Sequence, residues 1–178
     1  MSRGRVRSAV RHPLLSSAVG LALSTLAGTA AAQVQSLTAE EAGNLIRFEP
    51  GVRVVLIYST TCRPSHQMFP EVVQLLERYS PLGVRFLAFS IDPTPDDVAG
   101  YLASVGYPFE RLHIQPWQPG ELLAALAPSG IDVRRQVATP HIAVIDANGH
   151  LVGQLQGGWG AQKTDRWLRS LGFRPGAE

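Results

Sequence analysis

The sequence predicts an α/β protein in which helices flank a central mixed β-sheet. Two nearly continuous apolar stretches, Val52–Tyr58 and Gly83–Ile91, have the character of strands buried on both faces. A stretch with helical spacing of apolar residues follows each of them. Nearer the C-terminus, two apolar segments flank Ala147-Asn148-Gly149, which is a pattern typical of a β-hairpin. This order of elements predicts a sheet that is parallel in its first half and antiparallel in its second half.

The first half begins with residues 37–48, which mix apolar and acidic residues and predict a lead-in strand and a short helix. After the first buried strand, an amphipathic helix is expected up to Tyr79, with Pro70 inside it and kinking it. Its apolar face is formed by Met68, Phe69, Val72, Val73, Leu75, Leu76 and Tyr79.

A second helix is expected after the second strand. It opens at Asp96 and Asp97, because acidic residues suit the positive end of a helix, and it continues through Val105. With prolines on both sides of Thr94, we interpret Asp92 together with Asp96 and Asp97 as helix-capping residues and not as a carboxylate site.

The C-terminal part of the chain is expected to contain an irregular segment or short strand at 109–118 and a helix at 119–126. The two strands of the hairpin are predicted at His141–Asp146 and His150–Leu155. A last helix carries an apolar face formed by Trp167, Leu168 and Leu171.

Residues 1–32 predict a secretory signal peptide. Four arginines without an acidic residue precede an apolar stretch at 14–26, and Ala30-Ala31-Ala32 offers a small-residue cleavage site before Gln33. The apolar stretch is shorter than the roughly 20 residues of a membrane-spanning helix, and an uncleaved anchor is the alternative. We therefore expect residues 33–178 to fold as a single domain in the bacterial periplasm, with no membrane association after cleavage.

The charge distribution argues against nucleic-acid binding. The whole chain has a formal charge of +2, and removing the four arginines of the leader leaves −2. The basic isoelectric point therefore belongs mostly to the leader, and no nucleic-acid partner is expected.

The chain has one cysteine, Cys62, which excludes an internal disulfide. In an exported protein such a cysteine is a free reactive thiol or an intermolecular partner, for example in a disulfide-linked dimer. Cys62 lies at a strand-to-helix junction, where unpaired amides and the adjacent Arg63 favour the thiolate. A buried, inert cysteine is the alternative, but the polar sequence Thr61-Cys62-Arg63-Pro64-Ser65 favours a reactive one.

Two segments carry a family resemblance. Residues 54–71 resemble the strand, Cys-x-x-Cys turn and proline-kinked helix of the thioredoxin superfamily, in particular exported thiol:disulfide oxidoreductases of the TlpA/ResA type. Residues 137–140, before a strand that ends in Asp146, are similar to the cis-proline loop of that family. The resemblance spans about Phe48 to Leu171 and implies a thioredoxin-like fold. We expect no cofactor and no bound metal.

The resemblance also implies residue roles. Cys62 matches the attacking cysteine, Pro140 the cis-proline beside it, and Thr139 the residue whose backbone pairs with a bound substrate peptide. Arg63 and Pro64, which follow the cysteine, are expected to contact the substrate.

The sequence departs from the family at Ser65, which occupies the place of the second, resolving cysteine, and at Thr61, where a tryptophan is often found. A serine hydroxyl does not attack a mixed disulfide effectively, so an outside thiol has to complete the exchange. Ser65 is still expected to take part in catalysis, because its hydroxyl is able to donate a hydrogen bond to the thiolate.

Two histidines, His66 and His141, are near the cysteine or the proline in the sequence. Either is a candidate base or thiolate-stabilising cation, but we interpret both as solvated surface residues. A copper or zinc site formed with Cys62 is a further alternative that we do not favour, because the ligand spacing matches no known type.

The leading hypothesis is a periplasmic monothiol oxidoreductase that acts on disulfides of proteins or small molecules through Cys62. One alternative is a non-catalytic binding module with a thioredoxin fold. A peroxiredoxin-like peroxidase is a weaker alternative, because the proline expected before the threonine of that family is replaced by Val55 or Leu56, depending on the alignment.

Overall fold

The computed structural model describes residues 34–107, 110, 112–115, 118–132, 138–157 and 160–176. The predicted leader, residues 1–32, lies outside this range. The strands are β1 (Gln35–Leu37), β2 (Arg53–Tyr58), β3 (Arg85–Ser90), β4 (Leu112–Ile114), β5 (His141–Ile145) and β6 (Leu151–Gln156). The helices are α1 (Ala39–Phe48), α2 (Arg63–Tyr79), α3 (Pro95–Ser104), α4 (Pro119–Leu126) and α5 (Gly160–Ser170), with 3-10 helices η1 (Ser80–Leu82) and η2 (Ala127–Ser129).

The strands form one sheet in the order β1-β4-β3-β2-β5-β6. The pairs β1–β4, β4–β3 and β3–β2 are parallel, whereas β2–β5 and β5–β6 are antiparallel. At the centre, Ile57 of β2 lies between Phe89 of β3 and His141 of β5. The prediction of a mixed α/β sheet with a parallel and an antiparallel half is therefore confirmed.

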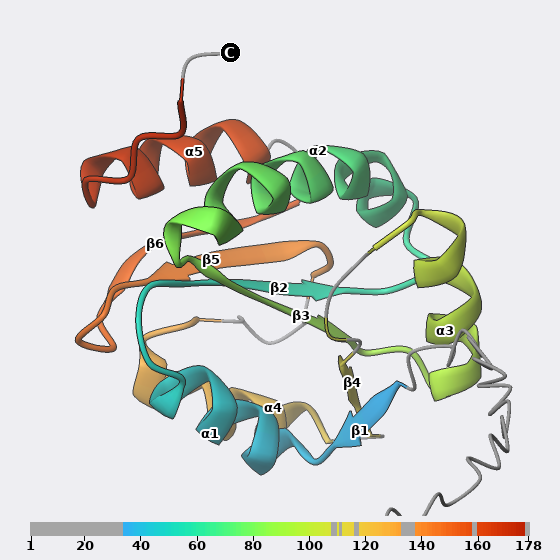
Figure 1. Cartoon of the computed structure of the whole chain (residues 1–178). Coiled ribbons are helices and arrows are strands. Elements are labelled where there is room, and N and C mark those ends of the chain that lie inside the picture. The colour runs from blue at the N-terminus through green and yellow to red at the C-terminus, as the bar shows by residue number, and fades with distance from the viewer. Residues whose placement is uncertain are drawn as a thin grey trace, which may run out of the picture. The chain divides into compact units, whose positions relative to one another are not determined.

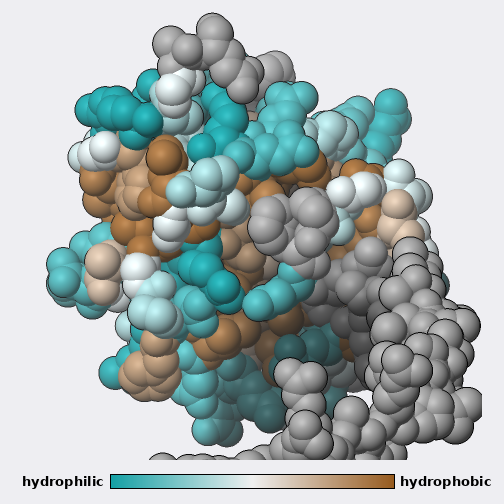
Figure 2. Space-filling view, viewed as in Figure 1, coloured by the Kyte–Doolittle hydropathy of each residue, from teal (hydrophilic) through white to brown (hydrophobic). Residues whose placement is uncertain are grey.

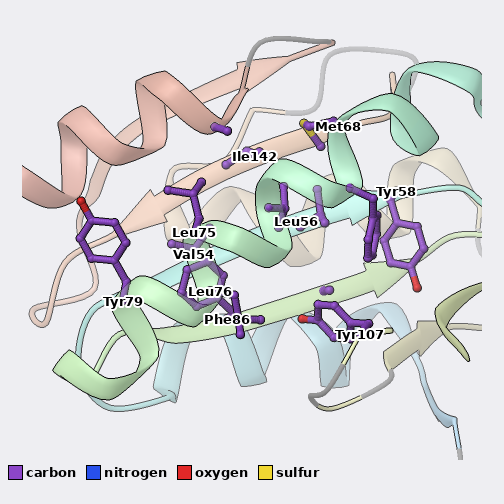
Figure 3. Close-up of a cluster of buried hydrophobic side chains, with 14 of the residues drawn as sticks. Val54, Leu56, Tyr58, Met68, Leu75, Leu76, Tyr79, Phe86, Tyr107 and Ile142 are labelled. Atoms are coloured by element: carbon purple, nitrogen blue, oxygen red, sulfur yellow. The ribbon is translucent and has the colours of Figure 1, made fainter. Parts of the chain in front are cut away.

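Helices cover both faces of the sheet. In Figure 1, α2 and α5 lie on one face, and α1 and α4 lie on the other. Because successive side chains of a strand point to opposite faces, β2 contributes to two separate hydrophobic clusters. Figure 3 shows the cluster under α2, where Met68 and Leu75 of the helix lie near Ile142 of the sheet.

The strand β2 is buried along its whole length, including its charged first residue Arg53, which is 1% exposed. The Arg53 guanidinium donates hydrogen bonds to the carbonyl oxygens of Ile46 (2.5 Å), Gly51 (2.7 Å) and Arg47 (3.0 Å). It therefore satisfies carbonyl groups that have no partner in the last turn of α1. Hydrogen bonding replaces the water that this buried cation has lost.

The helix α2 begins at Arg63, before the first residue of the predicted apolar pattern, and continues through Pro70.

The face shown in Figure 2 carries hydrophilic residues over its helices, with hydrophobic residues visible between them. In the ranges that the structure describes, no helix has the length and apolar character needed to cross a membrane.

Candidate functional site

The candidate site lies where β2 ends and α2 begins. Residues 59–61 form a turn after Tyr58, and Cys62 is the N-cap residue of α2. The Cys62 N–H donates to the Ser59 carbonyl oxygen (3.2 Å), and the Cys62 carbonyl oxygen accepts from the His66 N–H (3.2 Å). Pro64, in the first turn of the helix, fits there because an N–H at that position needs no partner inside the helix. The sulfur is thus held at the positive end of a 17-residue helix.

The thiol lies beside the Thr139-Pro140 loop. Cys62 is partly exposed, and its Sγ donates a hydrogen bond to the Thr139 carbonyl oxygen at 3.3 Å. The peptide bond between Thr139 and Pro140 is cis. Thr139 is half-buried and Pro140 is buried. Two segments that are far apart in the sequence therefore meet at the sulfur.

The pKa of the Cys62 thiol is lowered from its ordinary value. Burial raises this pKa and is the largest single influence. Hydrogen bonds with the Thr139 side chain and with the backbone and side chain of Ser65 lower it, and together they outweigh burial and the charge of Asp92. The bond to the Thr139 carbonyl oxygen requires a protonated thiol, because a carbonyl only accepts. The thiolate is instead stabilised by hydrogen bonding from the Thr139 side chain and from Ser65, which lies in the first turn of the helix.

Ser65 is fully buried, and its Oγ has no hydrogen-bond partner by distance and angle among the residues that the structure describes. Hydrogen bonding from its N–H and from its hydroxyl lowers the pKa of the Cys62 thiol. A buried hydroxyl without a partner is unfavourable unless a charge or ligand satisfies it. A thiolate at Cys62 is an acceptor of this kind.

The other predicted site residues are less buried. Arg63 and Pro64 are exposed beside the thiol at the start of α2. Arg63 was expected to favour the thiolate through its charge. The charge of the Asp92 carboxylate acts in the opposite direction and raises the pKa of Cys62.

The interpretation of Asp92 as a helix-capping residue is wrong. The N-cap of α3 is Thr94, whose hydroxyl donates to the Asp97 carboxylate at 2.8 Å. Asp92 is instead buried next to the turn that carries the thiol, where its carboxylate accepts hydrogen bonds from Ser59 and Thr60. Burial raises the pKa of Asp92, whereas hydrogen bonds from Ser90, Ser59 and Thr60 lower it. The hydrogen bonds together have the larger effect, so the pKa of Asp92 is below its ordinary value.

The interpretation of both histidines as surface residues is right for His66 and wrong for His141. His66 is exposed, and its Nε2 bonds to the Thr60 carbonyl oxygen. His141 is fully buried, because β2 and β6 pair with β5 on either side of it, and its Nε2 lies 3.2 Å from Oε1 of Gln154. Burial lowers the pKa of His141 and so favours the neutral ring.

A metal site formed by Cys62 and the two histidines is not supported. Each histidine is occupied by a different partner, Thr60 for His66 and Gln154 for His141. Over the described ranges, no three His, Cys, Asp or Glu side chains are grouped closely enough to hold a metal ion.

Comparison with solved structures identifies the fold. A thioredoxin-family thiol:disulfide interchange protein from Chlorobium tepidum is 23% identical and superposes with a TM-score of 0.55 over 67% of this chain and 79% of its own. A DsbF homologue from Corynebacterium diphtheriae is 13% identical, with a TM-score of 0.57 over 67% of this chain and 71% of its own. No family model matches the sequence, and no curated protein matches it. The described chain thus has a thioredoxin-like fold, which is the fold that the resemblance implies.

Proposed function

We propose that this protein is a periplasmic monothiol thiol:disulfide oxidoreductase that forms mixed disulfides through Cys62. The main observation in favour is a partly exposed thiol at a helix N-terminus whose pKa is lowered by hydrogen bonding. The similar solved proteins are named for thiol:disulfide interchange, which agrees with this chemistry. The periplasmic location rests on the predicted leader at 1–32.

In the first step, the Cys62 thiolate attacks one sulfur of a disulfide R–S–S–R′. A new bond forms between Cys62 and the R sulfur, the original S–S bond breaks, and R′ leaves as a thiolate. In a two-cysteine protein a second internal thiol would then attack the mixed disulfide. This chain has one cysteine, so a thiolate from outside attacks the R sulfur and releases Cys62 as the leaving group.

Each residue near the sulfur has a role in this scheme. Ser65 donates to the Cys62 thiolate, both before attack and when Cys62 leaves in the second step. Thr139 and Pro140 form the wall of the substrate site, and once the thiol ionises the Thr139 carbonyl oxygen is free to accept an N–H from a bound peptide. Arg63 and Pro64 are exposed beside the thiol and contact the part of the substrate that faces solvent.

A binding module that captures its partner as a mixed disulfide is the second candidate. The observation that favours it is the serine at the position of the resolving cysteine, since without an outside thiol the adduct persists. A disulfide-linked dimer through Cys62 would be one form of such an adduct.

The test is turnover in the presence of glutathione. The full chain without its leader is incubated with oxidised glutathione, the adduct on Cys62 is measured by intact mass, and reduced glutathione is then added. We expect one adduct that disappears on reduction, and catalysed reduction of a glutathionylated peptide that Cys62→Ser abolishes. An adduct without turnover would favour the binding module, and the absence of any adduct would contradict both.

A further inference from the structure

A buried carboxylate lies directly behind the turn that presents the thiol. Asp92, the second residue after β3, is 3% exposed. Its Oδ1 accepts from the Ser59 hydroxyl (2.7 Å) and the Thr60 N–H (3.0 Å). Its Oδ2 accepts from the same N–H (2.8 Å) and from the Ser90 hydroxyl (2.5 Å). Two of these three donor residues belong to the turn at 59–61.

The bonds continue from Asp92 toward Cys62. Because the Ser59 hydroxyl gives its proton to Asp92, its oxygen accepts from the Thr61 hydroxyl (2.9 Å) and the Thr61 N–H (3.2 Å). The Ser59 carbonyl oxygen accepts the Cys62 N–H at 3.2 Å. Each residue of the turn before the sulfur therefore takes part in at least one hydrogen bond of this network.

Asp92 is itself held in place from the far side. Its backbone carbonyl oxygen accepts from Nε2 of the buried His113 at 2.7 Å, and Nδ1 of that ring lies 3.1 Å from the Ser36 hydroxyl. On the outer side of the turn, the Thr60 carbonyl oxygen is bonded by His66, whose ring packs against Tyr101 with 4.5 Å between centroids. The turn thus lies between one fixed carboxylate and one fixed ring.

We propose that Asp92 is a positioning residue for Cys62, because its buried carboxylate fixes the 59–61 turn and so holds the thiol beside Thr139 for attack on a disulfide. This inference rests on the proposed exchange reaction at Cys62. Charge-assisted hydrogen bonds of this kind are stronger than neutral ones, and this burial excludes competing water.

The same carboxylate has a second, opposite effect on the thiol. Its negative charge raises the pKa of Cys62. Replacing the Asp92 carboxylate by a neutral group should therefore lower the pKa of the Cys62 thiol and, at the same time, loosen the turn at 59–61. A residue that served stability alone would not change the thiol in these two ways at once.

The test compares three variants that each retain Cys62. Asp92→Asn removes the charge and one acceptor oxygen. Ser59→Ala removes a bond between the carboxylate and the turn. Ser90→Ala is the matched control, because it removes two bonds with Asp92, one to the carboxylate and one from the N–H, and neither involves the turn. Reaction with iodoacetamide against pH measures the thiol pKa, and reaction of the fully ionised thiol with oxidised glutathione measures positioning.

We expect Asp92→Asn to lower the thiol pKa and to slow exchange with oxidised glutathione by about tenfold or more, since misplacing a reacting atom by about 1 Å costs on the order of 10²-fold. Ser59→Ala should slow exchange without lowering the pKa, and Ser90→Ala should leave the exchange rate within about twofold. If Asp92→Asn does not fold, the inference is tested by comparing the exchange rates of Ser59→Ala and Ser90→Ala.

If the wild-type protein exchanges with oxidised glutathione and Asp92→Asn or Ser59→Ala does so at the same rate, this inference is overturned but the proposed function is not. An equal loss in Ser90→Ala would also overturn it, because the effect would then not pass through the turn. A wild-type thiol that does not exchange would instead refute the proposed function, and this inference with it.

Discussion

The Cys62 sulfur lies 3.3 Å from the Thr139 carbonyl oxygen, although 77 positions separate the two residues in the sequence. Their proximity follows from the sheet. The strands β2 and β5 are antiparallel neighbours, with Ile57 opposite His141, so the segment after β2 lies beside the segment before β5. The candidate site is therefore formed by two loops at one end of the sheet.

Replacing Ser65 by alanine tests the role of its hydroxyl. The variant Ser65→Ala removes a donor that lowers the pKa of Cys62, so the thiol pKa should rise and exchange at pH 7 should slow. The pH dependence of alkylation measures this directly. Ser129→Ala is a matched control, because Ser129 is also a buried serine without a hydrogen-bond partner for its hydroxyl among the described residues. The role of Ser65 would be refuted if both variants had the same thiol pKa.

Replacing Ser65 by cysteine should convert the protein into a two-cysteine reductase. The new thiol would occupy the position from which a mixed disulfide on Cys62 is attacked, so outside thiol would no longer be needed for release. We expect a gain of insulin reduction with a dithiol as reductant. Ser129→Cys adds a second cysteine outside the candidate site and should show no gain. A folded Ser65→Cys variant without reductase activity would count against the site.

The buried His141 predicts a loss of stability in acid. Burial lowers its pKa in the folded protein below the ordinary value of 6.5, whereas hydrogen bonding to Gln154 and the charge of Asp132 oppose this less strongly. Below pH 6.5 the unfolded chain therefore binds a proton that the folded chain does not bind. The free energy of unfolding should be largest above pH 6.5 and fall as the pH decreases, with a slope of at most about 1.4 kcal/mol per pH unit for this residue.

Urea unfolding at several pH values measures this slope. The variant His141→Gln does not titrate and should have a smaller slope between pH 7 and pH 5. In the folded protein Nε2 of His141 faces the accepting oxygen of Gln154, so protonation would place a proton on Nδ1, which has no partner among the described residues. Equal slopes in the two proteins would show that His141 is not the group responsible.

Removing the Arg53 guanidinium should destabilise the fold without changing the thiol. Arg53→Met leaves the carbonyl oxygens at the end of α1 without donors, and breaking a buried polar interaction of this kind costs on the order of 3 kcal/mol. Denaturant unfolding measures the loss. The folded fraction should keep the wild-type rate of alkylation at Cys62, and a changed rate would mean that Arg53 also acts on the site.

The sequence predicts most of the fold because its strands and helices have strong local patterns. The continuous apolar run of β2 and the hairpin around Gly149 both appear in the structure close to their predicted positions. Arg53 shows the limit of this reasoning. The apolar pattern predicts a buried strand from Val52 to Tyr58 but does not show how the charge of Arg53 is satisfied there, and only the position of α1 explains this.

The candidate site was predicted less completely, because several of its contacts join segments that are distant in the sequence. The position of Cys62 follows from local order, since a strand and a helix meet there. The role of Asp92 depends on Ser59 and Thr60, more than 30 positions earlier, and the local pattern of prolines and acids indicated a helix cap instead. His141 is buried only because strands distant in the sequence pair on both sides of it.

The pH dependence of alkylation at Cys62 in the wild-type protein tests the central claim most directly. Iodoacetamide reacts with the thiolate, so its rate reports both the accessibility of the sulfur and its ionisation. We predict complete reaction, with a half-maximal rate at a pH below the ordinary thiol pKa of 9.0. A sulfur that does not react in the folded protein, or one that ionises only at or above that value, would contradict the account.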